Sequence, residues 1–174
     1  MVLLGAHMDA AYNLARWLSR NEADAEDLVQ DAYLRAFKYF GSLRGGDMRS
    51  WLLTIVRNRF YDGLKRTKAH DHSVFDENAH SAGEETVHPE TTLLAGERTE
   101  LMREALEELP IGLREVLVLR ELEEMSYKEI ANLTGIPVGT VMSRLSRARQ
   151  QIKQNLRFRV AGDAAAPRSN IRRP

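Results

Sequence analysis

Apolar residues recur at three- and four-residue spacing along most of this 174-residue chain, and this helical period restricts its fold more than any other feature. Within residues 24–40 the four-residue series is Leu28, Ala32, Ala36 and Phe40, with Phe37 alongside. Further helices are predicted over residues 8–20 and from Trp51 to Leu64. No segment shows the two-residue alternation of a strand. The sequence therefore predicts an all-α protein.

One stretch without any period divides the chain. Residues 69–92 are rich in Asp, Glu, His, Ser and Thr, which is the composition of a flexible segment. We therefore expect two small helical domains, over residues 1–68 and 96–160, joined by an acidic flexible linker over residues 69–95. Residues 161–174 are expected to form a disordered tail.

Charge is arranged in blocks of alternating sign. The chain has 25 basic and 25 acidic residues, yet residues 35–68 carry 9 basic and 2 acidic groups, and residues 138–174 carry 9 and 1. Residues 69–137, between them, carry 5 basic and 16 acidic groups. Two positive blocks predict two anion-binding surfaces. The acidic block also leaves open a compact, self-inhibited form in which the second domain folds against the first.

Several function classes find no support in the residue types. Without cysteine there is no disulfide framework, thiol nucleophile or cysteine metal site, and no apolar run approaches the roughly 18 residues of a membrane span. The histidines of the linker, His70, His72, His80 and His88, follow no helical or strand spacing, so we expect no metal site. We expect a soluble cytoplasmic protein that inserts in no membrane, uses no cofactor and is not an enzyme.

A helix-turn-helix is predicted in the second domain. Ser126 with Glu129 three residues later is a capping-box pattern, so a short helix is expected from Tyr127 to the turn at Gly135. Pro137 suits the start of the next helix, expected to run to about residue 157. Two helices joined by such a turn form a DNA-binding motif whose second helix enters the major groove.

The second helix of this motif has an apolar side and a basic side. Its inward stripe is predicted to contain Val141, Leu145, Ala148 and Ile152, which places the intervening serines and arginines outward. Arginine binds phosphates and can read guanine. A solvated cationic surface is the alternative, and the turn, the capping box and the absence of acidic residues favour DNA contact.

Three segments together resemble the sigma-70 family of bacterial RNA polymerase initiation factors, and within it the small extracytoplasmic-function (ECF) group. They are DAEDLVQDAYLRAF (24–37), RSWLLTIVRNRFYDGLKR (49–66) and LPIGLREVLVLRELEEMSYKEIANLTGIPVGTVMSRLSRAR (109–149). In the family these positions belong to the polymerase-binding and promoter-melting parts of sigma domain 2 and to sigma domain 4. Their order around a linker makes the resemblance specific.

The resemblance implies roles for residues of the first domain. Asp27, Gln30 and Asp31 would bind core RNA polymerase, whose beta and beta-prime subunits are the expected partners, and the acidic first turn would also stabilise the helix dipole. The residues expected to bind the -10 element are Arg49, Ser50, Arg57 and Asn58. Asn58 matches the base-reading asparagine of the family. We place the neighbouring Trp51 mainly in the core.

The resemblance also implies that the second domain binds the -35 element. The residues expected to do so are Lys128, Thr140, Met142, Ser143, Arg144, Ser146, Arg147 and Arg149. Met142 departs from the family pattern, which has a basic or polar residue there, and a methionine side chain can contact a thymine methyl group.

The implied function is promoter-specific transcription initiation, with promoter DNA and an anti-sigma factor as further partners. The linker would replace the third domain of housekeeping factors, where its acidity either imitates nucleic acid or is simply solvated. The alternative function is a LuxR-like helix-turn-helix regulator, which shares a KEIA-like first helix but lacks the first two segments quoted above.

Overall fold

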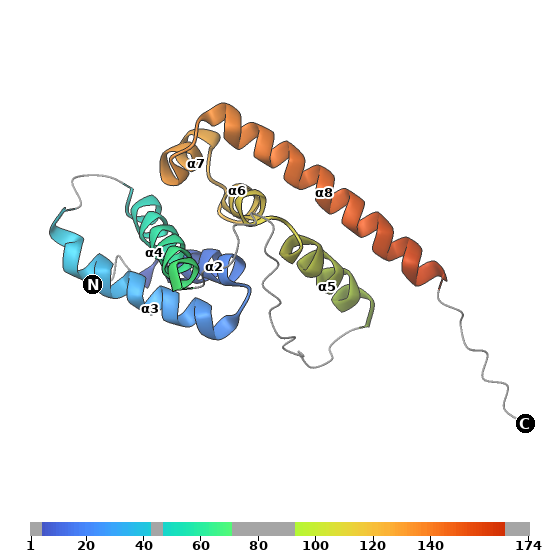
Figure 1. Ribbon diagram of the computed structural model, residues 1–174, viewed down its shortest axis with the longest axis horizontal. Coiled ribbons are helices and arrows are strands. Elements are labelled where there is room, and N and C mark those ends of the chain that lie inside the picture. Colours follow the sequence, from blue (N-terminus) through green and yellow to red (C-terminus); the bar gives the residue numbers. More distant parts are fainter. Residues whose placement is uncertain (1–4, 43–46, 71–92, 166–174) are drawn as a thin grey trace, which may run out of the picture.

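A computed structural model describes residues 5–42, 47–70 and 93–165, and helices are its only regular secondary structure within these ranges (Figure 1). The first group contains α2 (Met8–Ser19), α3 (Glu22–Tyr39), the short 3-10 turn η1 (Phe40–Ser42) and α4 (Met48–His70). The second group contains α5 (Leu93–Glu107), α6 (Ile111–Glu121), α7 (Tyr127–Thr134) and α8 (Val138–Ala165). The all-α prediction is therefore confirmed. The predicted linker is wrong at both ends, because residues 69–70 belong to α4 and residues 93–95 to α5. The rest of the linker and residues 166–174 of the predicted tail lie outside the described residues.

Local signals explain where the helices of the first group begin. The Asn21 side chain accepts a hydrogen bond from the backbone N–H of Asp24, which starts α3 two residues earlier than the sequence pattern indicated. Asp47 precedes α4, and its carboxylate accepts hydrogen bonds from the backbone N–H groups of Arg49 and Ser50 at 3.2 and 3.1 Å. These side chains satisfy amide groups that have no partner within the helix.

The first group packs as a three-helix unit around small and branched side chains. Buried residues at its centre are Leu14, Leu18, Ala32, Ala36, Leu52, Leu53 and Val56. Trp51 is half-buried against this core, as expected. The predicted stripe of α3 is wrong at its C-terminal end, because Phe37 and Phe40 are exposed. A helical period identifies an apolar face, but it does not say which part another helix covers.

The second group is organised around α6. Residues 114–119 are buried without interruption, a pattern that a helix with a solvated side cannot show. Helices α7 and α8 contact α6 within the second group, and α2 contacts it from the first (Figure 1). The buried apolar side chains of both groups consequently form one continuous core. Helix α8 ends at Ala165, so the first five residues of the predicted disordered tail are helical.

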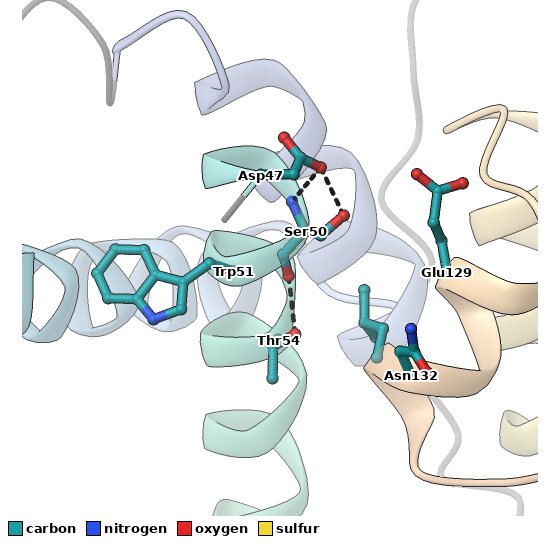
Figure 2. A pocket seen from close by; sticks show the side chains of 7 residues that line it. Asp47, Ser50, Trp51, Thr54, Glu129 and Asn132 are labelled. Carbon is teal, nitrogen blue, oxygen red and sulfur yellow. Dashed lines mark hydrogen bonds between the residues drawn. The ribbon is translucent and has the colours of Figure 1, made fainter. Parts of the chain in front are cut away.

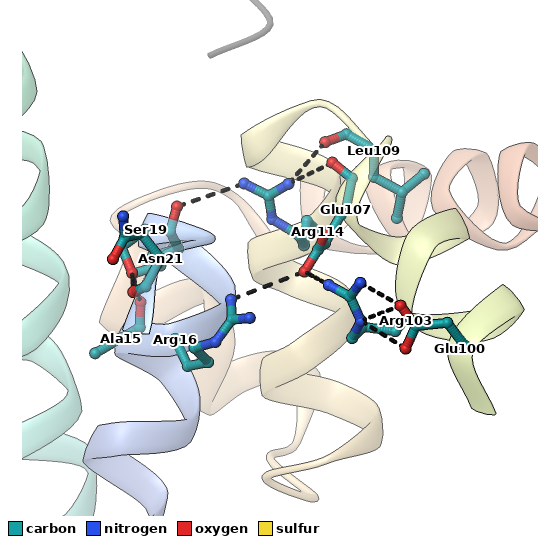
Figure 3. Close-up of polar contacts among 10 residues, drawn as sticks. Ala15, Arg16, Ser19, Asn21, Glu100, Arg103, Glu107, Leu109 and Arg114 are labelled. Carbon is teal, nitrogen blue, oxygen red and sulfur yellow. Dashed lines mark hydrogen bonds and ion pairs between the residues drawn. The ribbon is translucent and has the colours of Figure 1, made fainter. Parts of the chain in front are cut away.

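Arg114 of α6 links the C-terminal ends of α2 and α5 where the two groups meet. Its guanidinium, in a residue only 2% exposed, donates to the backbone oxygens of Glu107 at 2.8 Å, Leu109 at 3.4 Å and Leu18 at 3.4 Å (Figure 3). Carbonyls at a helix C-terminus have no intrahelical partner and carry partial negative charge, so an arginine is well suited to them. Burial nevertheless lowers the pKa of Arg114 to about 10.

Candidate nucleic-acid and polymerase interfaces

The helix-turn-helix has the local geometry that its sequence predicts. Ser126 Oγ accepts from the Glu129 N–H at 3.2 Å, and Glu129 Oε2 accepts from the Ser126 N–H at 2.7 Å, which completes the capping box. Hydrogen bonding of the Glu129 carboxylate to the side chain of Ser126, and to its backbone N–H, holds the pKa of this carboxyl below its usual value. Gly135 ends α7 at φ +72°, in the left-handed region that glycine enters most readily. Pro137 then precedes α8 and accepts its first backbone hydrogen bonds.

Helix α8 buries the predicted inward stripe and exposes most of the predicted DNA-binding residues. Val141, Leu145 and Ala148 are buried, and Ile152 is half-buried against the core, which confirms the stripe. Exposed on the other side are Met142, Ser143, Ser146, Arg147 and Arg149, and Lys128 is exposed on α7. Thr140 is half-buried. Met142 is 53% exposed, and Val138, one turn earlier, is also exposed. This surface therefore offers cations, hydroxyls and an apolar pair to the same ligand.

Two of the α8 arginines, Arg144 and Arg149, contact other residues of the second group. Arg144 is half-buried rather than outward, and its Nη1 lies 3.1 Å from the position that a Cβ on Gly112 would occupy. The missing side chain of Gly112 leaves room for this guanidinium on the side of α6. Arg149 is exposed, but its Nη2 lies 2.6 Å from Glu121 Oε1. An exposed pair of this kind is worth at most about 1 kcal/mol and can be exchanged readily for a phosphate.

Two of the four predicted -10 residues are ion-paired with the second group. Arg49 is paired with the Glu123 carboxylate and donates to the Glu123 backbone oxygen at 2.7 Å. Arg57 Nε lies 2.7 Å from Glu115 Oε1. Ser50 donates to the Asp47 carboxylate at 2.6 Å, and Asn58 is exposed. Only Asn58 is thus directed to solvent.

Sequence reasoning did not find the carboxylates that meet these arginines. Glu115 and Glu123 lie 58 and 74 positions away from their arginines, and their helical spacing gives no sign of the pairing. The Glu115 side chain is 0% exposed, and burial raises the pKa of its carboxyl, although Arg57 opposes that rise. Tyr61 donates to Glu115 Oε2 at 3.2 Å, and its own pKa is raised by burial.

The predicted polymerase-binding residues lie along α3. Asp27 and Gln30 are exposed, whereas Asp31 is half-buried and paired with Arg59 of α4. Beside them the structure adds an apolar surface that the sequence did not predict to be exposed. A pocket of about 700 Å³ lies between α2 and α3, and Phe37, 69% exposed, is at its edge. Its remaining apolar lining includes Met8, Tyr12, Val29, Tyr33 and Leu34. Exposed apolar surfaces of this kind are typical of protein interfaces.

The described residues contain neither a metal-binding cluster nor a membrane-spanning helix. Among the described side chains, no three histidines or acidic residues are grouped as metal ligands would be. The linker residues His72, His80 and His88 lie outside the described residues. No helix of the described part of the chain has the length and apolar composition to cross a membrane.

Comparison with known families accounts for both helical groups. Residues 3–70 match the family Sigma-70 region 2, and residues 99–152 match Sigma-70, region 4. The chain is 36% identical over 137 residues to the ECF RNA polymerase sigma-E factor of Escherichia coli, and this match covers 74% of the chain and 72% of the relative. The chain belongs to the sigma-70 family, whose members are non-catalytic transcription initiation factors.

Further relatives place it in the ECF group. It is 33% identical over 153 residues to the ECF RNA polymerase sigma-E factor of Haemophilus influenzae, covering 82% of the chain and 79% of that protein. It is 34% identical over 154 residues to the ECF RNA polymerase sigma factor SigE of Mycolicibacterium smegmatis. That match covers 88% of the chain but only 60% of SigE. These findings give no support to the LuxR-like alternative, because region 2 is absent from such regulators.

Two solved structures have the same arrangement of helices. The sigma factor RpoE, crystallised with the anti-sigma factor NepR from Bartonella quintana, matches with a TM-score of 0.71 and 31% identity, covering 88% of this chain and 94% of that chain. CnrH, in complex with the cytosolic domain of CnrY, matches with a TM-score of 0.63 and 28% identity, covering 90% of this chain and 86% of the CnrH chain. Both neighbours were therefore studied with a bound partner.

Proposed function

We propose that this chain binds core RNA polymerase and directs it to promoters that carry a -10 and a -35 element. The first helical group corresponds to sigma domain 2 and the second to sigma domain 4. The observation that carries the proposal is the exposed side of α8, where Arg147 and Arg149 lie beside hydroxyls opposite a buried apolar stripe. A major-groove helix needs this division, because phosphates and base edges meet one side while the domain core holds the other.

The -35 reader comprises the exposed residues of α8 together with Lys128. Arginine contacts position the helix on phosphates or read guanine, and the apolar pair Val138 and Met142 suits thymine methyl groups. Arg144 and Thr140 would join this surface by a small side-chain movement. The contribution of Met142 distinguishes this chain from family members with a polar residue at that position.

The -10 reader comprises Arg49, Ser50, Arg57 and Asn58 along one helix. A single strand is bound by cations that follow its backbone and by polar groups that read exposed base edges. Asn58 is exposed and can make such base contacts, while the two arginines and Ser50 hold the strand. Each reader alone binds weakly. Joining both through polymerase raises their effective concentration on one promoter, so binding without polymerase should be poor and strongly salt dependent.

Polymerase would bind along α3 through Asp27, Gln30 and Asp31, with the neighbouring apolar pocket contributing area. The beta and beta-prime subunits are the expected partners, and domain 4 would make a second contact with polymerase. An anti-sigma factor is a further partner, as for the structural neighbours RpoE and CnrH. Because its proposed partners are RNA polymerase and promoter DNA, we expect the protein to act in the cytoplasm.

Multi-round transcription in vitro tests this function directly. Core RNA polymerase would be incubated with a fragmented genomic library, with and without the purified chain. We expect discrete new transcripts whose upstream sequences share two spaced elements. Core polymerase alone measures background, and a pull-down measures polymerase binding separately. Polymerase binding without new transcripts would contradict promoter recognition, and absence of both would remove the proposed function.

A further inference from the structure

We propose that Arg59 is a positioning residue for polymerase binding, which holds the Asp31 carboxylate of α3 toward polymerase without binding polymerase itself. The inference rests on the proposed function, because Asp31 is one of the residues that would bind polymerase. Arg59 lies between two carboxylates, those of Asp31 on α3 and Asp62 on α4. These three residues are called the α3–α4 ion-pair cluster below.

The first argument is the direction in which Arg59 leaves α4. Successive residues of an α-helix point about 100° apart, so three neighbours face three ways. Arg57 is turned toward α6 and Asn58 toward solvent. Arg59 reaches across to α3, which packs beside α4 (Figure 1), and its Nε is paired with Oδ2 of Asp31. Of these three residues, Arg59 is therefore the one that meets the proposed polymerase surface.

The second argument is the difference in exposure between the two partners. The Arg59 side chain is 15% exposed, whereas that of Asp31 is 41% exposed. Another protein can therefore reach the Asp31 carboxylate but has little access to the guanidinium behind it. A carboxylate offers about four lone-pair sites on its two oxygens, so an arginine on Oδ2 leaves acceptor capacity for a cation of the partner. Arg59 thus orients Asp31 without saturating it.

The third argument is the place of Asp31 on α3. Asp27, one turn earlier, and Gln30 are exposed, and Leu34, which lines the apolar pocket, is 67% exposed. Ala32, in contrast, is buried in the core. Asp31 consequently lies at the border between the core and the proposed polymerase surface. A side chain at such a border can turn along the helix or away from it, so a neighbour has to set its direction.

Without Arg59, the Asp31 carboxylate would have another cation within reach. Arg35 is exposed and follows Asp31 by four residues on α3, the spacing at which an acidic side chain pairs with a later basic one. Such a pair would turn Asp31 along the surface of α3, and a cation of polymerase would have to displace Arg35 before it could bind. Arg59 prevents this competition because it holds the carboxylate on the side of α4.

Arg59 is itself held in place on α4. Its Nη1 lies 3.9 Å from Oδ2 of Asp62, three residues later. At the start of the same helix, Asp47 accepts hydrogen bonds from the backbone N–H and the Oγ of Ser50, at 3.1 and 2.6 Å, so the N-terminal end of α4 is also fixed (Figure 2). A planar guanidinium donates to two carboxylates in fixed directions. A lysine at this position would keep the charge but lose that geometry.

The kinetics of polymerase binding distinguish positioning from a simple effect of charge. Removal of the Arg59 charge makes the surface of α3 more negative, which should speed association with the cations that Asp31 would meet. Loss of a fixed Asp31 orientation should instead speed dissociation, because substitutions that affect an interface act mostly on the off-rate. We expect the change in dissociation to be the larger of the two.

One experiment measures association and dissociation of the full chain on immobilised core RNA polymerase. Wild type would be compared with Arg59→Gln, Arg59→Lys and the matched control Arg66→Gln. Arg66 is exposed and lies two turns beyond Arg59, so its substitution removes the same charge from the same helix at a distance from Asp31. We expect dissociation to be about tenfold faster for the glutamine variant and about threefold faster for the lysine variant. Equal dissociation rates for wild type and both Arg59 variants, or an equal acceleration in the control, would overturn the proposal.

A double-substitution cycle tests whether Arg59 acts through Asp31. Asp31→Asn alone should speed dissociation, and Arg59→Gln in that background should add less than about twofold. An undiminished effect of Arg59→Gln in the Asp31→Asn background would overturn the positioning role. Urea midpoints measure folding separately. A merely structural loss would lower the fraction of active protein but leave the dissociation rate of bound molecules unchanged, and Arg59→Lys retains the charge if the glutamine variant folds poorly.

The outcomes separate this inference from the function on which it rests. If the wild-type chain fails to bind core polymerase, the proposed function is wrong and the inference with it. If the wild type binds and supports transcription while Arg59→Gln dissociates at the wild-type rate, only the positioning role is lost. Faster dissociation of Arg59→Gln that disappears in the Asp31→Asn background would support the proposal.

Discussion

The turn of the helix-turn-helix allows a sharp prediction about backbone conformation, using two glycines that lie four positions apart. Gly135 has φ +72°, whereas Gly139 lies in the first turn of α8 and outside the positive-φ region. A Cβ added at either position would meet no atom within 4 Å. Replacement of each glycine by alanine therefore changes backbone preference almost alone.

The two substitutions should have opposite signs. An L-residue in the left-handed region costs about 1–2 kcal/mol, so Gly135→Ala should lower the free energy of unfolding by that amount. Alanine within a helix is up to about 1 kcal/mol better than glycine, so Gly139→Ala should raise it. The pair should differ by about 1.5–3 kcal/mol from these two terms.

Urea denaturation followed by circular dichroism measures the difference. The midpoint should shift down for Gly135→Ala and up for Gly139→Ala while the slope stays constant. Gly135→Asn supplies a control, because asparagine tolerates the left-handed region better than alanine and should fall between alanine and glycine. Shifts of the same sign for the two alanine variants would refute the argument that φ alone decides the effect at Gly135.

Three further predictions concern the cap of α4 and the two DNA readers. Asp47→Ala should destabilise the protein by about 1 kcal/mol and Asp47→Asn by less. Hydrogen bonds from Ser50 lower the pKa of Asp47 in the folded protein. The stabilisation by the Asp47 carboxylate is therefore present above the pKa of the unfolded chain and is lost as pH falls through the pKa of the folded protein. The urea midpoints of the wild type and the Asp47→Ala variant should accordingly approach each other below about pH 4. Arg147→Ala should reduce transcription from an intact -35 promoter about tenfold without weakening polymerase pull-down. Equal ratios of activity on intact and -35-mutated promoters for both proteins would remove its assigned role. Asn58→Ala should reduce permanganate reactivity of the -10 region more than it reduces initial binding, and unchanged reactivity would contradict base reading.

Features encoded by neighbouring residues were predictable from the sequence. The capping box of α7, the glycine that ends it and the buried stripe of α8 each depend on side chains within two helical turns. The same locality explains why the exposed -35 residues were largely found. Arg144 is the exception, because its orientation depends on Gly112 of another helix, which leaves space for a guanidinium.

Features set by long-range packing were not predictable. Phe37 of α3 and Phe40, in the η1 turn that follows it, continue the apolar spacing of α3. Both are exposed, although their spacing alone indicates burial. The partners of Arg49 and Arg57 were hidden for a related reason. Alternating charge blocks indicate that the two halves attract, but the particular glutamates become evident only when α6 and the α6–α7 turn are placed against α2 and α4.

The ion pairs between the two helical groups give a physical reason for the zero net charge of the chain. A chain that binds DNA at two places needs concentrated cations, which would also bind nucleic acid without specificity. The glutamates paired with Arg49 and Arg57 neutralise part of this positive charge where the two helical groups meet. Salt should then act unequally, since it screens exposed contacts with phosphate more than it screens the buried Glu115 and Glu123. As ionic strength rises, DNA binding by the free chain should therefore weaken while the Arg49–Glu123 and Arg57–Glu115 pairs persist.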